Sequence, residues 1–151
     1  MGRKGDHMRI TDLLDKNSIC LDASPADKTE ALNQIVSLMG KSGKINDIEA
    51  YRKQVFLREE ESTTGIGEGI AIPHGKCDAV TKPGLAAMVV KDGVDFDSLD
   101  GEPVTLLFLI AAPNTEDNVH LDVLSKLSVL MMDEDFSESL RNAKTVDEFL
   151  N

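Results

Sequence analysis

The sequence predicts a single three-layer α/β domain, with a central mixed β-sheet flanked by helices on both faces. Two near-continuous apolar runs, 85–90 and 104–111, have the length and composition of strands that are covered on both faces. Segments with helical apolar spacing precede and follow these runs. The length of 151 residues fits one domain, and we find no internal repeat, low-complexity segment or linker that would divide it.

The N-terminal part of the chain predicts two helices around one strand. Apolar residues indicate a short helix over 10–14 and a short strand over 18–21. A second helix is expected after Ser24, which would be its N-cap, with Pro25 in the first turn. Apolar residues then recur at helical spacing as far as Met39.

A third helix and a short strand are predicted before the first long apolar run. Asn46 is followed three positions later by Glu49, which resembles a capping arrangement for a helix that runs to Arg58. Alternate glycines over 65–69 then break the helical pattern. The apolar segment 70–73 is predicted to be a short strand that ends at its proline.

Helices are predicted to close the domain. Turn-forming aspartates, a glycine and a proline separate the two long strands. A helical pattern then resumes at Val119 and continues to Met131. Apolar residues over 136–150 indicate one or two final helices, so that strands alternate with helices along the chain.

Charge and composition exclude several classes of function. The chain has 16 Lys and Arg residues against 27 Asp and Glu residues, a formal net charge of −11, which argues against binding a nucleic acid or an anionic membrane. Only 4% of the residues are aromatic and Trp is absent, so base-stacking platforms are not expected. The two cysteines show no CxxC spacing, and no apolar run has the length of a membrane helix. We therefore expect a cytoplasmic domain. Residues 1–7 lack periodicity and are interpreted as an artificial leader before a domain over 8–151.

His74 is the first candidate for chemistry. It follows Pro73, which fixes the backbone, and precedes Gly75, which has no side chain to crowd the imidazole. The amides of Gly65 and Gly67 could point into a shared anion-binding concavity nearby. Near neutral pH an uncharged imidazole is a good nucleophile. The residues alone are equally compatible with a histidine that is hydrogen-bonded within a turn.

His120 and Arg58 are the next candidates. His120 lies near the start of the predicted helix after the second long strand, where free amides and the helix dipole favour an anion. Strand ends are where sites assemble in α/β sheets, so His120 could meet His74 at one edge of the sheet. Arg58 could neutralise phosphate oxygens. Without further information, His120 could equally be a core or capping residue, and Arg58 could pair with the glutamates at 59–61.

Two further residues have weaker signals. Thr64 could donate its hydroxyl to an anion or could cap its own loop. Cys77 forms an H-x-x-C spacing with His74, but no second ligand pair completes a metal site, and only Lys76 lies beside it to activate the thiol. We therefore expect neither a metal nor another cofactor.

The segment 64–75, TGIGEGIAIPHG, closely resembles the active-site segment of fructose/mannitol-type enzyme IIA domains of the bacterial phosphoenolpyruvate-dependent sugar phosphotransferase system. The matching pattern is an acidic residue (Glu59), six residues, Ile-Gly, two residues, and Ile-Ala-Ile-Pro-His-Gly. The resemblance extends over 8–151 and includes Arg58 and the segment that ends at His120. It is strongest for the fructose branch, with mannitol next.

The resemblance implies a phosphoryl carrier. His74 would accept a phosphoryl group on Nε2 from the phosphocarrier protein HPr and pass it to a cysteine of enzyme IIB during sugar uptake. His120 would orient the phosphate, Arg58 would balance its charge, and a loop with Thr64, Gly65, Gly67 and Gly75 would bind it. No enzyme IIB-like cysteine loop follows in the sequence, so the acceptor would be a separate chain or a part of a longer protein that is attached to a membrane permease.

Two other classes of function are compatible with these residues. Regulatory enzyme IIA proteins, such as the nitrogen-related members, carry the same histidine motif but signal by binding target proteins according to their phosphorylation state. A phosphorylatable domain of a transcription regulator is another version of this alternative. A small phosphoester hydrolase that uses His74 and His120 as acid and base would act without a protein donor.

Overall fold

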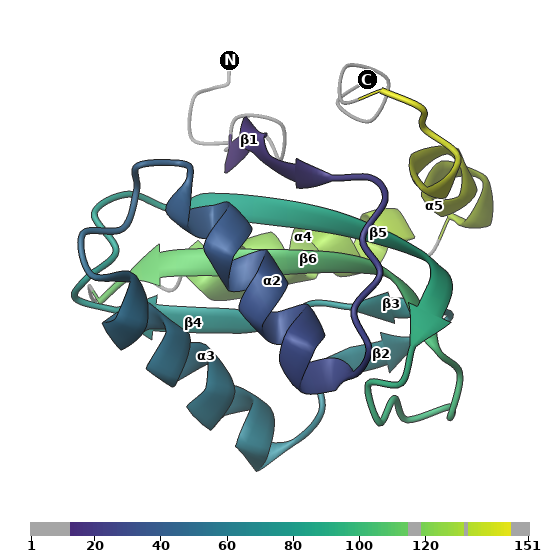
Figure 1. Ribbon diagram of the computed structural model, residues 1–151, viewed down its shortest axis with the longest axis horizontal. Coiled ribbons are helices and arrows are strands. Elements are labelled where there is room, and N and C mark those ends of the chain that lie inside the picture. The colour runs from purple at the N-terminus through teal and green to yellow at the C-terminus, as the bar shows by residue number, and fades with distance from the viewer. Residues whose placement is uncertain (1–12, 115–118, 132, 146–151) are drawn as a thin grey trace.

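The computed structural model describes residues 13–114, 119–131 and 133–145. The strands are β1 (Leu14–Cys20), β2 (Gly65–Gly67), β3 (Ile70–Ala71), β4 (His74–Cys77), β5 (Gly84–Val94) and β6 (Val104–Pro113). The helices are α2 (Lys28–Gly40), α3 (Ile48–Glu61), α4 (Val119–Met131) and α5 (Glu134–Arg141) (Figure 1). None of these helices is long and apolar enough to cross a membrane.

The strands form one mixed sheet in the order β1-β5-β6-β3-β2, with β4 also paired to β6. The two long central strands, β5 and β6, are antiparallel. β1 is parallel to β5, while β3 and β4 are parallel to β6. The predicted mixed sheet is therefore confirmed, and the two apolar runs are its central strands.

β3 and β4 lie one after the other along the same side of β6. Ile70 pairs with Leu106 and His74 with Ile110, so the register is continuous across the break between the two strands. Pro73 interrupts the ladder because it has no N–H to donate, but its carbonyl accepts a hydrogen bond from the Ile110 N–H at 3.0 Å. His74 is consequently the first residue of a short strand at the edge of the sheet.

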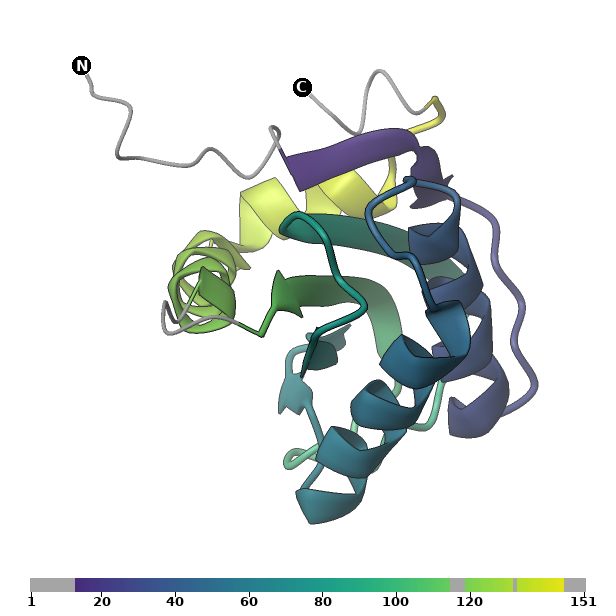
Figure 2. The same cartoon turned by 90° about the vertical axis from the view of Figure 1, so that its left-hand side faces the viewer.

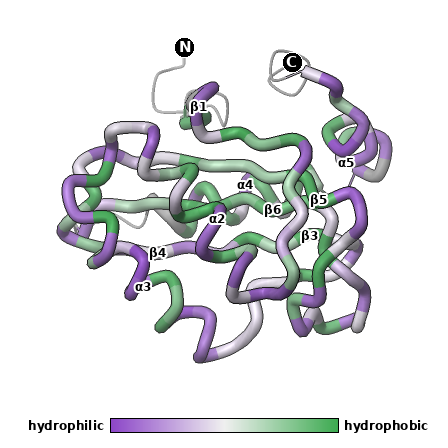
Figure 3. The backbone as a smooth tube through the Cα atoms, viewed as in Figure 1, coloured by the Kyte–Doolittle hydropathy of each residue, from purple (hydrophilic) through white to green (hydrophobic). Residues whose placement is uncertain are grey.

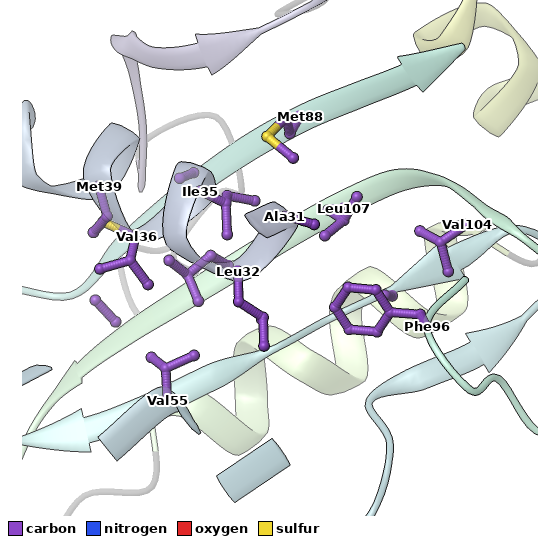
Figure 4. Packing of buried hydrophobic residues seen from close by; sticks show 14 of the residues in the cluster. Ala31, Leu32, Ile35, Val36, Met39, Val55, Met88, Phe96, Val104 and Leu107 are labelled. Atoms are coloured by element: carbon purple, nitrogen blue, oxygen red, sulfur yellow. The ribbon is translucent and has the colours of Figure 1, made fainter. Parts of the chain in front are cut away.

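Helices cover both faces of the sheet, as predicted. In the edge-on view, α2 and α3 lie on one side of the strands and α4 lies on the other (Figure 2). Figure 4 shows the core under α2, where its apolar side chains pack on β5 and β6. The residues of this core that come from α2 are Ala31, Leu32, Ile35, Val36 and Met39.

The opposite face has its own core. It combines alternate residues of β6 with residues of α4 and α5, namely Leu106, Phe108, Ile110, Val123, Leu127, Met131 and Leu140. Because successive strand residues point to opposite faces, an apolar run of this length can supply both cores. Figure 3 accordingly shows hydrophobic residues along the middle strands and hydrophilic ones in the loops.

The helix starts correct two expectations. α2 begins at Lys28 rather than after Ser24, because its N-cap is Asp27, whose carboxylate accepts a hydrogen bond from the Glu30 N–H at 2.8 Å. α3 begins at Ile48 with Asp47 as N-cap, one residue later than the predicted Asn46. Ser, Asn and Asp are about equally good caps, so residue type alone cannot choose between neighbours.

Other differences lie near the ends of the chain and around the glycines. β1 already begins at Leu14, so the predicted helix over 10–14 is wrong at that residue, and its remaining residues before Leu13 lie outside the described part. The glycine segment forms strand β2, which pairs with β3. α5 accounts for the first of the predicted closing helices. The predicted domain start at Met8 and the helical pattern beyond 145 fall outside the described residues.

Candidate functional site

His74 lies in an open cleft of about 790 Å³ between the edge strand β4 and the helices α3 and α4. Figures 1 and 2 show β4 between these two helices, with α3 toward one face of the sheet and α4 toward the other. The residues that line the cleft are Gln54, Leu57, Arg58, Glu60, Glu61, His74, Gly75, Lys76, Leu121 and Leu124. The structure therefore brings together three of the predicted site residues, which are Arg58, His74 and Gly75.

The imidazole of His74 is held in one orientation. Its Nδ1 lies 3.1 Å from the carbonyl oxygen of Ile72. Because a carbonyl oxygen can only accept a hydrogen bond, Nδ1 must carry the proton in this contact. In the neutral ring the lone pair is then on Nε2, which makes Nε2 the nucleophilic atom.

The charge state of His74 also favours nucleophilic chemistry. Burial lowers its pKa below the ordinary value of 6.5, and the Arg58 guanidinium lowers it further, whereas the contact with the Ile72 carbonyl and the charges of Glu59 and Glu61 act in the opposite direction. The net shift is downward, so the neutral form of the ring predominates at pH 7.

Arg58 lies in the last turn of α3, where it lines the cleft. Its Nη1 donates a hydrogen bond to the carbonyl oxygen of Ser62 at 3.0 Å and is 3.5 Å from the Ser62 hydroxyl oxygen. Glu59, which follows Arg58 in the sequence, forms its ion pair with Lys28 instead, at 2.9 Å. Among the described residues, the guanidinium is thus held beside the cleft by a neutral partner.

Gly75 has a packing role that sequence reasoning did not identify. A Cβ atom at this position would lie 3.0 Å from ring carbon Cε1 of Tyr51 and 3.0 Å from Cγ2 of Val55. The glycine therefore allows α3 to approach β4 closely. The buried Tyr51 hydroxyl donates a hydrogen bond to the Ile110 carbonyl at 2.7 Å, which ties α3 to β6 as well, and burial raises the pKa of that phenol well above 10.

Thr64, Gly65 and Gly67 do not line the His74 cleft. Thr64 is buried, and its hydroxyl donates a hydrogen bond to Glu59 Oε1 at 2.6 Å. A Cβ on Gly65 would collide with the Ser98 hydroxyl, and Gly67 has a φ of +99° beside the Asp100 carboxylate. These three residues thus meet neighbours inside the fold, and the alternative that Thr64 caps its own loop agrees with this contact.

The backbone of His120 is in the first turn of α4, as the sequence predicts, and its side chain is outside the described part of the structure. Leu121 and Leu124, which follow it on α4, line the cleft. The N-terminal end of α4 therefore borders the cleft that contains His74.

Cys77 is separated from the cleft. It is three residues beyond His74 in β4, and it packs against the core under α2 and α3. Its Sγ accepts a hydrogen bond from the Ala79 N–H at 3.4 Å.

The comparison with protein families identifies the domain. Residues 12–151 match the model of the family described as "Phosphoenolpyruvate-dependent sugar phosphotransferase system, EIIA 2". A "PTS system fructose-specific EIIABC component" of Bacillus subtilis (strain 168) is 44% identical over 95% of this chain, which spans only 23% of the length of that relative. A "PTS system fructose-specific EIIA component" of Haloferax volcanii is 41% identical over 84% of this chain and 82% of its own length.

Solved structures have the same fold. The nitrogen regulatory protein IIA-Ntr from Neisseria meningitidis superposes with a TM-score of 0.86 at 30% identity, covering 94% of this chain and 99% of that one. The enzyme IIA of the Escherichia coli complex of "enzyme IIAMTL and phosphorylated enzyme IIBMTL" superposes with a TM-score of 0.79 at 31% identity, covering 91% of this chain and 96% of that one. The chain therefore belongs to the EIIA 2 family of the phosphoenolpyruvate-dependent sugar phosphotransferase system, and it is a phosphotransferase component.

Proposed function

We propose that this chain is a phosphoryl carrier of a fructose phosphotransferase system, which accepts a phosphoryl group from HPr on His74 and passes it to a cysteine of enzyme IIB. The observation that carries this proposal is a neutral histidine in an open cleft, with its Nδ1 proton directed at a backbone carbonyl. Such a ring presents a nucleophilic nitrogen at neutral pH without the help of a separate base.

The transfer needs no proton acceptor. The Nε2 lone pair of His74 forms the new N–P bond while the N–P bond to the donor histidine breaks and its electron pair returns to that ring. The Nδ1 proton stays in its hydrogen bond with the Ile72 carbonyl. In the second step a cysteine thiolate of enzyme IIB forms an S–P bond, and the electron pair of the breaking N–P bond returns to Nε2.

Positive charge and hydrogen-bond donors would stabilise the phosphoryl oxygens. In this proposal Arg58 balances their charge from α3, and His120 donates a hydrogen bond from the first turn of α4, where the helix dipole adds to the effect. Gly75 belongs to the same cleft. Thr64, Gly65 and Gly67, whose contacts lie elsewhere, support the strands next to the cleft in this proposal and do not bind phosphate.

The identity of the branch and of the partners rests on the relatives. The Bacillus subtilis and Haloferax volcanii relatives are both named fructose-specific, and the Escherichia coli complex pairs an enzyme IIA with a phosphorylated enzyme IIB. The name of the Bacillus subtilis relative includes components B and C, so we propose that the domain works at the cytoplasmic side of a permease, either fused to it or as a separate chain. The net charge of −11 would favour encounters with basic docking surfaces.

The experiment that tests this proposal is intact mass measurement at mildly alkaline pH after incubation with phosphoenolpyruvate, enzyme I and HPr. We expect a gain of one phosphoryl group that acid treatment removes. His74→Ala should gain none, His120→Ala should gain it slowly, and Cys77→Ser should behave as the wild type. A wild-type chain that gains no phosphoryl group from a donor of verified activity would contradict the proposal, and so would a fully phosphorylated His74→Ala variant.

A regulatory role is the second candidate, because the IIA-Ntr structure superposes with a TM-score of 0.86. The two roles differ in the second step of transfer. A transport component should pass its phosphoryl group to a fructose-type enzyme IIB within seconds, while a regulatory protein should keep it and bind a target protein in only one phosphorylation state. Rapid quench of the phosphorylated chain with purified enzyme IIB distinguishes these outcomes.

A further inference from the structure

A buried carboxylate lies beside the site and takes no part in the proposed chemistry. Glu59, in the last turn of α3, is only 8% exposed. Its Oε1 accepts a hydrogen bond from the Thr64 hydroxyl at 2.6 Å, and its Oε2 accepts one from the Thr64 N–H at 2.8 Å. Lys28 Nζ lies 2.9 Å from Oε2. A buried carboxylate is costly unless it is paired and hydrogen-bonded, and this one is both.

The hydrogen bonds continue from Thr64 to the imidazole of His74. The Thr64 carbonyl accepts a hydrogen bond from the Ile72 N–H at 3.0 Å. The Ile72 carbonyl in turn lies 3.1 Å from His74 Nδ1. Ile72 lies between β3 and β4, outside both strands, and its N–H is held by Thr64. The contacts form one connected path from Glu59 to the nucleophile.

We propose that Glu59 is a positioning residue for His74, an inference that rests on the proposed phosphoryl transfer. Its carboxylate fixes Thr64, Thr64 holds the backbone N–H of Ile72, and the carbonyl of the same residue keeps the proton of His74 on Nδ1. The lone pair of the ring then stays on Nε2. Lys28 pairs with the carboxylate and so offsets the cost of burying its charge.

This positioning role predicts different results from a purely structural role. If the Glu59 contacts only join α3 to the following loop, their removal would change only the stability of the protein. A positioning residue would also change the tautomer of His74 and the rate of transfer, because the Ile72 carbonyl would no longer be held toward Nδ1. A small misplacement of a reacting group can lower a rate by about 10²-fold.

The test compares three variants of the full chain, Thr64→Val, Thr64→Ser and Glu59→Gln. Long-range ¹H–¹⁵N spectra of the unphosphorylated protein report the tautomer of His74, and single-turnover transfer from phosphorylated HPr reports the rate. We expect Thr64→Val and Glu59→Gln to populate the Nε2–H tautomer and to slow transfer by about tenfold or more. Thr64→Ser keeps the hydroxyl and should match the wild type in both measurements.

Thr81 provides a matched control outside this loop. Its hydroxyl donates a hydrogen bond to the Lys44 carbonyl at 2.9 Å, away from the path from Glu59 to His74. Thr81→Val should therefore keep the wild-type tautomer of His74 and the wild-type rate of transfer. If Glu59→Gln does not fold, the comparison of Thr64→Val with Thr64→Ser still decides the outcome.

A folded Thr64→Val protein with the wild-type His74 spectrum and a transfer rate within about twofold of the wild type would overturn the inference. Glu59 would then have a purely structural role. Failure of the proposed function has a different signature, because the wild-type chain would accept no phosphoryl group from HPr. The tautomer measurement needs no phosphoryl donor, so it tests the positioning role in either case.

Discussion

The two walls of the His74 cleft are built from different kinds of residue. The α3 wall is mainly polar and charged, and its residues are Gln54, Leu57, Arg58, Glu60 and Glu61. The α4 wall consists of Leu121 and Leu124 among the described residues. Leu121 is 49% exposed, so this wall presents apolar surface to solvent directly beside the histidine.

The two walls also differ in how they are attached to the sheet. α3 is fixed to the strands by specific contacts, the hydrogen bond from Tyr51 to the Ile110 carbonyl and the close approach at Gly75. α4 is attached through the apolar packing of Val123 and Leu127 on the far side of the sheet. We interpret the α3 wall as the part that sets the charge and geometry of His74. The exposed apolar α4 wall is typical of a surface that meets protein partners.

The largest expected effect comes from a substitution in the charged α3 wall. Arg58→Gln removes the cation that we propose faces the phosphoryl group, so transfer from HPr should slow by roughly 10²-fold, as for loss of one donor to a charged transition state. Rapid-quench assays measure the rate of phosphoryl transfer. Arg52→Gln is the matched control, because Arg52 is on the same helix but binds Glu49 and Asn33. Equal slowing in both variants would show that the loss of any positive charge on α3 slows transfer, whatever its position relative to His74.

A substitution at Gly75 tests how closely α3 must pack. Gly75→Ala places a methyl group 3.0 Å from Tyr51 and Val55, so we expect a loss of about 1–3 kcal/mol in the free energy of unfolding. Urea denaturation measures it. At Gly40 a Cβ would meet only the flexible end of the Ile48 side chain at 3.3 Å, so Gly40→Ala should be close to neutral. Wild-type stability of Gly75→Ala would show that α3 can move away from β4 without cost.

A substitution on the apolar wall should affect partner binding more than chemistry. Leu121→Ser should raise the KM for HPr by about three- to tenfold and leave kcat nearly unchanged, because it removes apolar contact area but no charge near His74. Val129→Ser is the control on the same helix, since Val129 is 65% exposed and does not line the cleft. A fall in kcat without a change in KM would place α4 in the chemistry instead.

The smallest expected effect concerns pH. Because burial lowers the pKa of His74 below 6.5, the rate of transfer should fall to half of its maximum only at a pH below 6.5. The same shift contributes stability that is fully present above pH 6.5 and is lost as the pH falls through the lower pKa of the folded state. An NMR titration of His74 checks the shift, and a midpoint above 6.5 would contradict it.

The arrangement of strands and helices could be predicted because its signals are local. The apolar runs that became β5 and β6 predict burial on both faces by their length and continuous apolar composition. The start of α2 could not be located in the same way. Lys28 as its first residue reaches Glu59 at 2.9 Å and lies 5.0 Å from the centre of the Phe96 ring, contacts that join distant parts of the chain.

The candidate site could be predicted only in part for the same reason. The sequence around His74 and its resemblance to a family made His74 the candidate nucleophile, and Arg58 lines the same cleft. The sequence predicted that the amides of Gly65 and Gly67 could form an anion-binding concavity, but not that Ser98 and Asp100 are the neighbours of these glycines. Glu59 was visible as a member of the motif, while its path through Thr64 depends on contacts that only the folded chain creates.

The most direct test of the central claim is the atom that carries the phosphoryl group. The ¹⁵N-labelled chain, phosphorylated through HPr at alkaline pH, can be examined for ³¹P–¹⁵N coupling. We predict coupling to Nε2 of His74, with the proton still on Nδ1 in its hydrogen bond with the Ile72 carbonyl. Phosphorus on Nδ1 of His74, or on any other histidine, would contradict the account.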